Sequence, residues 1–244
     1  MEDLKLPATL QEALISSLPG SGYYMPNFIT PTEEDYLLQK VNNVALPTWK
    51  HLSHRRLQAH PSPLSSSNTL LAADLPLWLS NPVISRLHPI PLFTDSKDNL
   101  FSKSPHRAPN HCLINEYKPG QGIHAHEDGD AYYPVVATVS LGSHIVLDVK
   151  PKDQARGPGW RILQEPRSLL ITTGELYTGC LHGISEIEVD EHLHAEDIAN
   201  WKLLGDKEAF ANGRAVRKTR VSLTYRDVRK VQNLGKAFGA LGRR

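Results

Sequence analysis

The sequence predicts a mainly β protein with helices at its N-terminal end, an α+β fold class. Apolar residues recur at helical spacing in the first third of the chain, whereas short alternating segments separated by glycine-containing turns follow from residue 112 onward. The 18 prolines in 244 residues imply many loops, and no internal repeat is visible. A hydrophobic fraction of 40% is a globular composition, so this length allows one sizeable domain, with or without appendages.

Two helices are expected near the start of the chain. Residues 1–20 read as a short helix, in which Thr9 and Glu12 have the spacing of a capping box. Residues 31–44 form the next expected helix, because acidic residues follow Thr32 at its start and apolar residues recur at helical spacing along it.

A third helix is expected over residues 74–90, with Asp74 as its N-cap. Pro82 is expected to kink or divide this helix, because proline lacks the N–H that a helix interior requires. The residues expected to pack on the sheet are Leu77, Trp78 and Ile84. Residues 94–110 are expected to be loop.

Residues 46–70 differ from both neighbours, because they contain one tryptophan, three histidines, two arginines and a tail rich in serine and proline. They are expected to form an irregular hairpin or loop, and residues 36–73 around them include no Asp or Glu. An aromatic ring flanked by cations can stack on a base and hold phosphate, which would give Trp49, Arg55 and Arg56 a binding role. The alternative is a solvated loop that Trp49 anchors to the core.

Strands are expected in the second half of the chain. Their predicted ranges are 112–117, 135–142, 144–150, 218–228, and two strands within 168–184 around Thr173-Gly174. The Gly142-Ser143 pair is a hairpin signal between the second and third of these ranges. Residues 153–161 are expected to be a loop or hairpin tip, and residues 185–213 a polar, acidic insertion.

A possible metal site lies at His126-Glu127-Asp128. Side chains alternate along an extended chain, so His126 and Asp128 point to the same side. A second histidine would complete two imidazoles and one carboxylate on one face of an octahedral metal, the arrangement that suits Fe(II) with open positions for a cosubstrate and dioxygen. His182 could supply it, although a lone histidine is more often a residue at the edge of the core. An exposed turn is the alternative for the tripeptide.

Four features occur in one order: Asn115-x-Tyr117, His126-x-Asp128, His182, and an alternating strand from Arg220 to Arg226. In this order, and in the stretches NEYKPGQGIHAHEDGDAYYP, VSLGSHIVLDV and RVSLTYR, the chain resembles the AlkB family of Fe(II)/2-oxoglutarate dioxygenases over roughly residues 20–235. The resemblance implies a double-stranded β-helix (jelly roll) whose N-terminal helices support one sheet.

The resemblance also implies a division of one dioxygenase domain that covers residues 1–244. Residues 1–110 would provide the N-terminal helices and a substrate lid, and residues 111–230 the jelly-roll core with the acidic insertion at about 185–213. Residues 231–244 would be a basic tail.

The resemblance implies cofactors and their ligands. Fe(II) would bind His126, Asp128 and His182, and dioxygen and 2-oxoglutarate would be consumed. Arg220 would hold the far carboxylate of 2-oxoglutarate through a charge-assisted, bidentate contact, and Arg226 would lie near the iron-proximal carboxylate and the aspartate. The remaining cosubstrate contacts would come from Asn115, Tyr117, Ser222 and Thr224. A structural ion pair is the alternative for either arginine.

The implied reaction is oxidative demethylation of an N-alkylated nucleic acid base, preferably single-stranded, with release of succinate, carbon dioxide and formaldehyde. Candidate substrate contacts are Trp49, Arg55, Arg56, Tyr132 and Tyr133. For the two tyrosines the alternative is a role in the wall of the pocket. The acidic stretch 183–199 would repel phosphate if it lined the same opening. The alternatives are the same chemistry on a protein side chain or small molecule, and a catalytically weak nucleic-acid-binding protein that retains the iron site.

Composition limits the other possibilities. A net charge of +1 neither demands nor excludes nucleic acid. Only two cysteines are present, Cys112 and Cys180, which fits a reducing compartment better than a disulfide framework. The N-terminus lacks the features of a signal peptide, and no apolar run is long enough to span a membrane. We therefore expect a location in the cytoplasm, the nucleus or both, with no membrane partner. A monomer is a separate expectation, which these observations do not establish.

Overall fold

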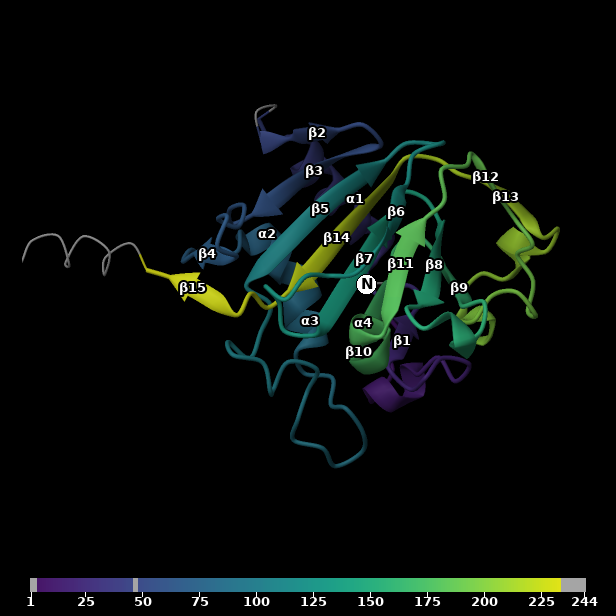
Figure 1. Ribbon diagram of the computed structural model, residues 1–244, viewed down its shortest axis with the longest axis horizontal. Helices are drawn as coiled ribbons and strands as arrows, with labels where there is room; N and C mark the ends of the chain where they lie inside the picture. The colour runs from purple at the N-terminus through teal and green to yellow at the C-terminus, as the bar shows by residue number, and fades with distance from the viewer. Residues whose placement is uncertain (1–3, 46–47, 234–244) are drawn as a thin grey trace, which may run out of the picture.

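The computed structural model describes residues 4–45 and 48–233, and most of its strands belong to two antiparallel sheets that face each other (Figure 1). The larger sheet contains, in order, β1 (Gly22–Met25), β10 (Leu169–Thr173), β7 (Val135–Leu141), β14 (Arg220–Arg226), β5 (His111–Tyr117), β3 (Arg55–His60) and β2 (Lys50–Leu52). The smaller sheet contains β6 (Ile123–His126), β11 (Cys180–Ile184), β8 (Ile145–Pro151) and β9 (Trp160–Gln164).

The chain passes repeatedly from one sheet to the other. β5 lies in the larger sheet, β6 in the smaller, β7 in the larger, β8 and β9 in the smaller, β10 in the larger and β11 in the smaller, before β14 returns to the centre of the larger sheet. This alternation is the double-stranded β-helix, so the predicted fold class, mainly β with a jelly-roll core and N-terminal helices, is confirmed.

The two faces of the larger sheet have different environments, and β14 shows this most clearly. Val221, Leu223 and Tyr225 pack into the main hydrophobic core on the helix-covered face. The alternate side chains face the space between the two sheets; they are Arg220, Ser222, Thr224 and Arg226. All seven residues of the strand are therefore buried, although four of them are polar.

The predicted helix over residues 31–44 is confirmed as α1 (Pro31–Asn42). Its cap is Thr30 rather than Thr32: the Thr30 hydroxyl accepts from the Glu33 backbone N–H at 3.1 Å, and the Glu33 carboxylate accepts from the Thr30 N–H at 2.8 Å. Leu37 and Val41 face the core of the larger sheet. In Figure 1 this helix lies behind that sheet.

The first predicted helix is wrong in extent, because residues 1–20 contain only a single 3-10 turn, η1 (Leu10–Ala13), in their described part. The Thr9 side chain makes no capping bond, and the Glu12 carboxylate accepts from Ala8 instead. The backbone N–H of Leu10 donates to Pro91 at 2.9 Å. Backbone hydrogen bonds to distant segments pair the N–H and C=O groups here, so the helix does not need to continue.

The predicted division at Pro82 is confirmed. Residues 77–87 form α2 (Leu77–Leu79), the π-helical turn η3 (Ser80–Ile84) and α3 (Ser85–Leu87). Asn81, directly before the proline, has φ −111° and ψ 131°, as expected where the proline ring disfavours the helical region for its predecessor.

Two details of the 74–90 prediction are wrong. Pro76, not Asp74, occupies the N-cap position. Trp78 and Ile84 pack against the core as expected, but Leu77 is 80% exposed, because the short α2 turns Leu79 inward.

The strands predicted around Gly142-Ser143 are confirmed, but the hairpin is wrong. The neighbours of β7 are β10 and β14, whereas those of β8 are β11 and β9, so the connection carries the chain between sheets. Gly142 has φ +81°, and a Cβ there would lie 2.7 Å from the carbonyl oxygen of Thr219. The tight turn with Gly142 in the left-handed conformation therefore connects strands of two different sheets.

The remaining elements surround this framework. The strands predicted within 168–184 are β10 and β11, but α4 (Gly174–Thr178) separates them and they lie in different sheets. The described part of 46–70 forms the hairpin β2–β3 and, near its end, β4 (Thr69–Leu71), which pairs in parallel with β15 (Lys230–Gln232). The 153–161 stretch is the tip between β8 and β9, with η4 (Gln154–Arg156), and 94–110 is loop.

The acidic insertion also has defined elements. It contains β12 (Val189–Glu191) paired with β13 (Arg214–Val216), and the turns η5 (Trp201–Leu203) and η6 (Glu208–Phe210). Most of the predicted basic tail lies outside the described residues, as do 46–47. The predicted division into lid, core and tail stays a prediction. Within the described residues, no helix combines the length and apolar character needed to span a membrane.

His111, at the start of β5, gives the fold a predicted pH dependence. The residue is 2% exposed, and burial, together with the charge of Arg226, lowers the pKa of its imidazole from 6.5 to about 4. The unfolded chain therefore binds one more proton between these pH values, so the contribution of His111 to stability is complete above pH 6.5 and is lost as the pH falls toward 4.

We expect the free energy of unfolding of the metal-free protein to fall less steeply with acid in His111→Gln than in the wild type. The difference in slope should approach about 1.4 kcal/mol per pH unit over that window. Urea unfolding at a series of pH values measures both slopes, and equal slopes would contradict this account of His111.

Candidate active site

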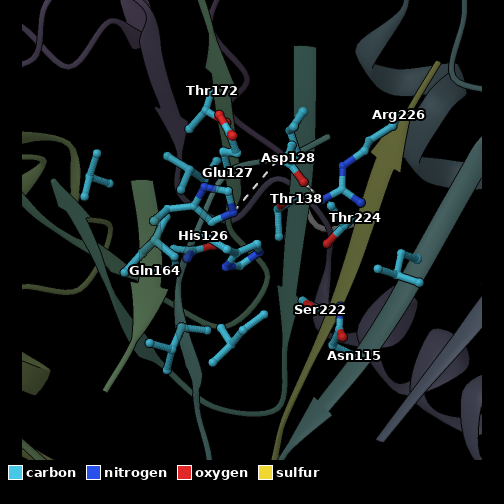
Figure 2. Close-up of a pocket in the computed structure, with 18 of the residues that line it drawn as sticks. Asn115, His126, Glu127, Asp128, Thr138, Gln164, Thr172, Ser222, Thr224 and Arg226 are labelled. Atoms are coloured by element: carbon cyan, nitrogen blue, oxygen red, sulfur yellow. Dashed lines mark hydrogen bonds and ion pairs between the residues drawn. The ribbon is translucent and has the colours of Figure 1, made fainter. Parts of the chain in front are cut away.

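A cavity of about 260 Å³ lies between the two sheets. Its walls come from β3, β5, β7, β10 and β14 of the larger sheet and from β6, β8, β9 and β11 of the smaller one. Figure 2 shows His126, Asp128 and Arg226 in one part of it, and Ser222 and Asn115 in another. The cavity therefore has two chemically distinct ends.

The first end gathers the three predicted metal ligands. His126 on β6 and His182 on β11 are direct register partners, and their ring centroids are 4.4 Å apart. Asp128 follows β6, and its Oδ2 lies 3.9 Å from Nε2 of His182. A Cβ on Gly183 would lie 3.0 Å from the Ala125 backbone nitrogen, so this glycine permits the close approach of the two strands.

The three side chains do not yet have the spacing of a metal site. The described residues contain no group of three His, Cys, Asp or Glu side chains already arranged to hold a metal. Oδ1 of Asp128 is ion-paired with Nη2 of Arg226, and Nδ1 of His126 lies 2.9 Å from the carbonyl oxygen of His124. Those bonds leave Oδ2 of Asp128 and Nε2 of His126 as the remaining donors. The backbone contact also orients the His126 ring, as hydrogen bonds to the second nitrogen of a ligating histidine do in metal sites.

The donor types nevertheless fit Fe(II). Two imidazoles and one carboxylate are the facial set of non-haem iron oxygenases. Burial lowers the pKa of His182 to about 4, against the opposing charge of Asp128, so its imidazole is neutral near pH 7. Neutral imidazole and ionised carboxylate are the forms that bind metal.

Two side chains that sequence reasoning missed hold the segment around Asp128. Lys152 pairs with the carboxylate of Glu127 and donates to the Thr178 carbonyl oxygen at 2.8 Å. Tyr177 donates from its hydroxyl to the carbonyl oxygen of Gly129 at 3.1 Å. These contacts join α4 and the residue directly after β8 to this segment, and no local sequence pattern predicts them.

The other end of the cavity is built on Arg220, which is 2% exposed. Its guanidinium donates to the Ser140 hydroxyl at 2.9 Å and to Oε1 of Gln164 at 3.2 Å. Among the described residues no carboxylate pairs with it, so the alternative of a structural ion pair is not supported for Arg220. Burial lowers its pKa to about 10, which still leaves the group charged near neutral pH.

A buried guanidinium without a counter-ion is costly unless an anion joins it. This end of the cavity is therefore suited to a carboxylate. Tyr117 lies beside it, with its ring centroid 5.8 Å from the Arg220 guanidinium carbon. Ser140 and Gln164, which orient Arg220, were not found from the sequence, because neither falls in a motif.

The structure brings all nine predicted metal and cosubstrate residues to one cavity. Their side chains line it together; they are Asn115, Tyr117, His126, Asp128, His182, Arg220, Ser222, Thr224 and Arg226. Arg226 occupies the metal end and Arg220 the opposite end of the regular strand β14. In Arg226 the structural ion-pair alternative holds at least in part, since Asp128 is its partner.

The prediction that Trp49 stacks on a base is wrong, because the ring is buried. Trp49 is 6% exposed and belongs to the main hydrophobic core. The guanidinium of Arg56 lies 4.1 Å from its ring centroid and donates to Glu116 at 2.8 and 2.6 Å. Trp49 thus anchors the β2–β3 hairpin, the other reading of this stretch, and the charge of Arg56 is already compensated.

The other three residues predicted to contact substrate differ in their positions. Arg55 lines the cavity and donates to Asn115. Tyr132 also lines it, with its ring centroid 4.9 Å from the Arg226 guanidinium. Tyr133 packs against the hydrophobic core instead and does not line the cavity.

The acidic residues of 183–199 do not line the cavity. Asp190 is buried and accepts two bonds from Arg217 at 2.7 Å each. Glu186 lies 3.1 Å from Nδ1 of His54 at the hairpin turn. The expected repulsion of phosphate at the opening therefore loses its structural basis.

Residues 22–226 match the model of the 2OG-Fe(II) oxygenase superfamily. A Danio rerio protein described as probable RNA/DNA demethylase ALKBH6 is 36% identical over 232 residues, which cover 91% of this chain and 92% of that protein. The Xenopus tropicalis tRNA (carboxymethyluridine(34)-5-O)-methyltransferase alkbh8 is 27% identical over 245 residues, which cover 93% of this chain and 36% of that longer protein.

Two solved structures share the fold. The structure of OsALKBH1 has a TM-score of 0.54 and 16% identity, and covers 86% of this chain and 99% of its own. An oxidoreductase of the 2OG-Fe(II) oxygenase family from Burkholderia pseudomallei has a TM-score of 0.53 and 12% identity, and covers 87% and 89%. At these identities the likeness concerns the fold alone.

Proposed function

The chain belongs to the 2OG-Fe(II) oxygenase superfamily, and from this membership we propose that it oxidatively demethylates N-alkylated bases of nucleic acids. The AlkB resemblance expected from the motifs is confirmed by the similarity to ALKBH6 over most of the chain. As a member of this superfamily, the protein is an oxygenase that uses Fe(II), 2-oxoglutarate and dioxygen.

The observation that carries the proposed chemistry is the single cavity with donors of a metal site at one end and an uncompensated guanidinium at the other. His126, Asp128 and His182 would hold the iron, and Arg220 the far carboxylate of 2-oxoglutarate. When bound, iron and cosubstrate supply the oxidation, in which one oxygen atom enters succinate as carbon dioxide leaves and the other hydroxylates the N-alkyl carbon. The resulting N-hydroxymethyl group releases formaldehyde and leaves N–H.

The contribution of the protein is position and charge. Arg226 pairs with Oδ1 of Asp128, which orients the carboxylate so that its Oδ2 faces His182. Lys152 and Tyr177 fix the chain on either side of Asp128. Apolar side chains from both sheets, among them Val136 and Leu147, also line the space between the two ends.

Two observations favour nucleic acid as the substrate class: the description of a related protein, and the residues found at the opening of the cavity. The related zebrafish protein is described as a probable RNA/DNA demethylase. The exposed Glu127 and Gly129 mark the open side, where Tyr132 lines the cavity. The exposed Arg229 donates to the Tyr132 carbonyl oxygen at 2.8 Å, so a guanidinium lies beside the aromatic residue at this opening.

A base must leave its stack to enter such a cavity, and a single strand reduces the cost of unpairing it. A single-stranded substrate is therefore part of the proposal. So are a monomeric state and a location in the cytoplasm, the nucleus or both.

The test is succinate formation by the iron-loaded protein with a panel of candidate substrates. We expect a methylated single-stranded oligonucleotide to stimulate turnover more than its duplex, while the same strand without methyl groups serves as the matched control. Stimulation by methylated peptides alone would favour a protein substrate. Salt-dependent oligonucleotide binding without any succinate would favour the catalytically weak binding protein.

A further inference from the structure

We propose that Arg55 is a positioning residue for the cosubstrate rather than a contact for nucleic acid. It turns the carboxamide of Asn115 toward the cavity and places a second guanidinium beside the dicarboxylate. The identity of that dicarboxylate, 2-oxoglutarate, rests on the proposed function. Arg55 is the first residue of β3, so the assignment makes the β2–β3 hairpin part of the cosubstrate pocket.

The contact that motivates the proposal joins neighbouring strands. Nε of Arg55 donates to Oδ1 of Asn115 at 3.2 Å. β3 pairs with β5 so that Arg56 lies opposite Glu116 and Leu57 opposite Asn115. Arg55 is half-buried and lines the same cavity as Asn115, whereas its neighbour Arg56 turns to Glu116 and Trp49.

This bond decides which atoms Asn115 offers to a ligand. An asparagine side chain has one acceptor oxygen and an NH₂ group with two donors. Because Arg55 occupies the oxygen, the NH₂ group is left for the cavity. A carboxylate ligand accepts hydrogen bonds only, so the orientation imposed by Arg55 is the one that can bind it.

The charge balance of the cavity points to the same ligand. Three charged groups that line it have partners: Asp128 pairs with Arg226, and Glu127 pairs with Lys152, which lies outside the lining. Among the described residues, Arg55 and Arg220 are the lining guanidiniums that pair with no carboxylate. Two uncompensated cations match a ligand with two carboxylates.

The Tyr117 hydroxyl is influenced by the charges of both Arg55 and Arg220, which indicates that both guanidiniums face the same part of the cavity. Burial raises the pKa of its hydroxyl, and the charges of Arg220, Arg55 and Arg226 oppose that rise in decreasing order. Tyr117 is also the register partner of Arg220 on β14. The positive field in this part of the cavity therefore comes from the hairpin as well as from the core strand.

The experiment is anaerobic calorimetric titration of 2-oxoglutarate into the Mn(II)-loaded protein. Arg55→Ala should weaken binding about ten- to hundredfold, the cost of losing charge-assisted hydrogen bonds. Arg55→Lys should recover part of the loss, because it keeps the charge without the planar fork. The matched control is Lys50→Ala, an exposed cation on the same hairpin, which should bind as the wild type does.

A split in the kinetics separates positioning from general damage. Arg55→Ala should raise the KM for 2-oxoglutarate and leave kcat nearly unchanged at saturation. If the alanine variant does not fold, the lysine variant decides by the same two measurements.

Two other results have distinct meanings. Wild-type affinity for 2-oxoglutarate in Arg55→Ala, with a reduced salt dependence of oligonucleotide binding, would overturn the inference and make Arg55 a phosphate contact. Failure of the wild type to bind 2-oxoglutarate would instead overturn the proposed function.

Discussion

Replacing Asp128 with alanine should remove both iron binding and 2-oxoglutarate turnover. The substitution deletes the only anionic donor of the proposed set and leaves Arg226, now without its carboxylate, beside His126 and His182. A metal dication would then meet two neutral imidazoles and an uncompensated guanidinium. Loss of outer-shell partners alone costs about ten- to hundredfold in metal affinity or activity, so loss of this ligand should cost more than about a hundredfold.

Metal analysis after iron loading and succinate formation without a nucleic acid substrate measure the two effects. Asp130→Ala is the matched control, because Asp130 is an exposed acid of the same segment that does not line the cavity. It should keep both iron and turnover. An Asp128→Ala protein with the iron content of the wild type would show that the metal lies elsewhere.

Replacing Arg220 with lysine should weaken 2-oxoglutarate binding about ten- to hundredfold, because an ammonium cannot reproduce the planar, bidentate contact of a guanidinium with a carboxylate. The hydrogen bonds that Arg220 donates to Ser140 and Gln164 hold the guanidinium in one orientation, and the shorter lysine cannot make both bonds and still reach the ligand. Titration of 2-oxoglutarate into each Mn(II)-loaded protein gives the dissociation constants.

Lys218→Met is the control for this experiment, since it removes an exposed cation two residues away without touching the cavity. Its affinity should match the wild type. An unchanged dissociation constant in Arg220→Lys would reject Arg220 as the carboxylate partner, whatever the effect on turnover.

Much of the site could be predicted because its chemistry follows local rules. The polar residues of β14 alternate with apolar ones, so a strand there had to place Ser222 and Thr224 on the face of Arg220. The order of the motifs then indicated which distant histidine, His182, would meet His126. Both expectations agree with the cavity that the structure contains.

Sheet membership could not be predicted in the same way. A glycine–serine turn has the same local chemistry whether the chain returns in one sheet or crosses to another, and the partners of β7 and β8 come from distant segments. The helix expected over residues 1–20 does not form for a related reason: the backbone N–H of Leu10 donates to the carbonyl oxygen of Pro91, a partner distant in the sequence.

The 46–70 stretch shows a second limit. Its composition suggested a nucleic acid surface, since tryptophan and arginine occur together. Whether an aromatic ring is exposed depends on tertiary packing. Here Arg56 bonds to Glu116 and lies over the Trp49 ring, and that ring packs in the hydrophobic core. The different roles of Arg55 and Arg56 arise from strand alternation once β3 is paired with β5.

The most direct test of the proposed activity is the product balance with a methylated single-stranded oligonucleotide. After subtraction of the succinate that forms without oligonucleotide, the iron-loaded wild type should release formaldehyde and succinate in equal amounts while methyl groups disappear from the bases, and Asp128→Ala should release neither. Succinate formed without formaldehyde, and with every methyl group retained across the oligonucleotide panel, would contradict nucleic acid demethylation.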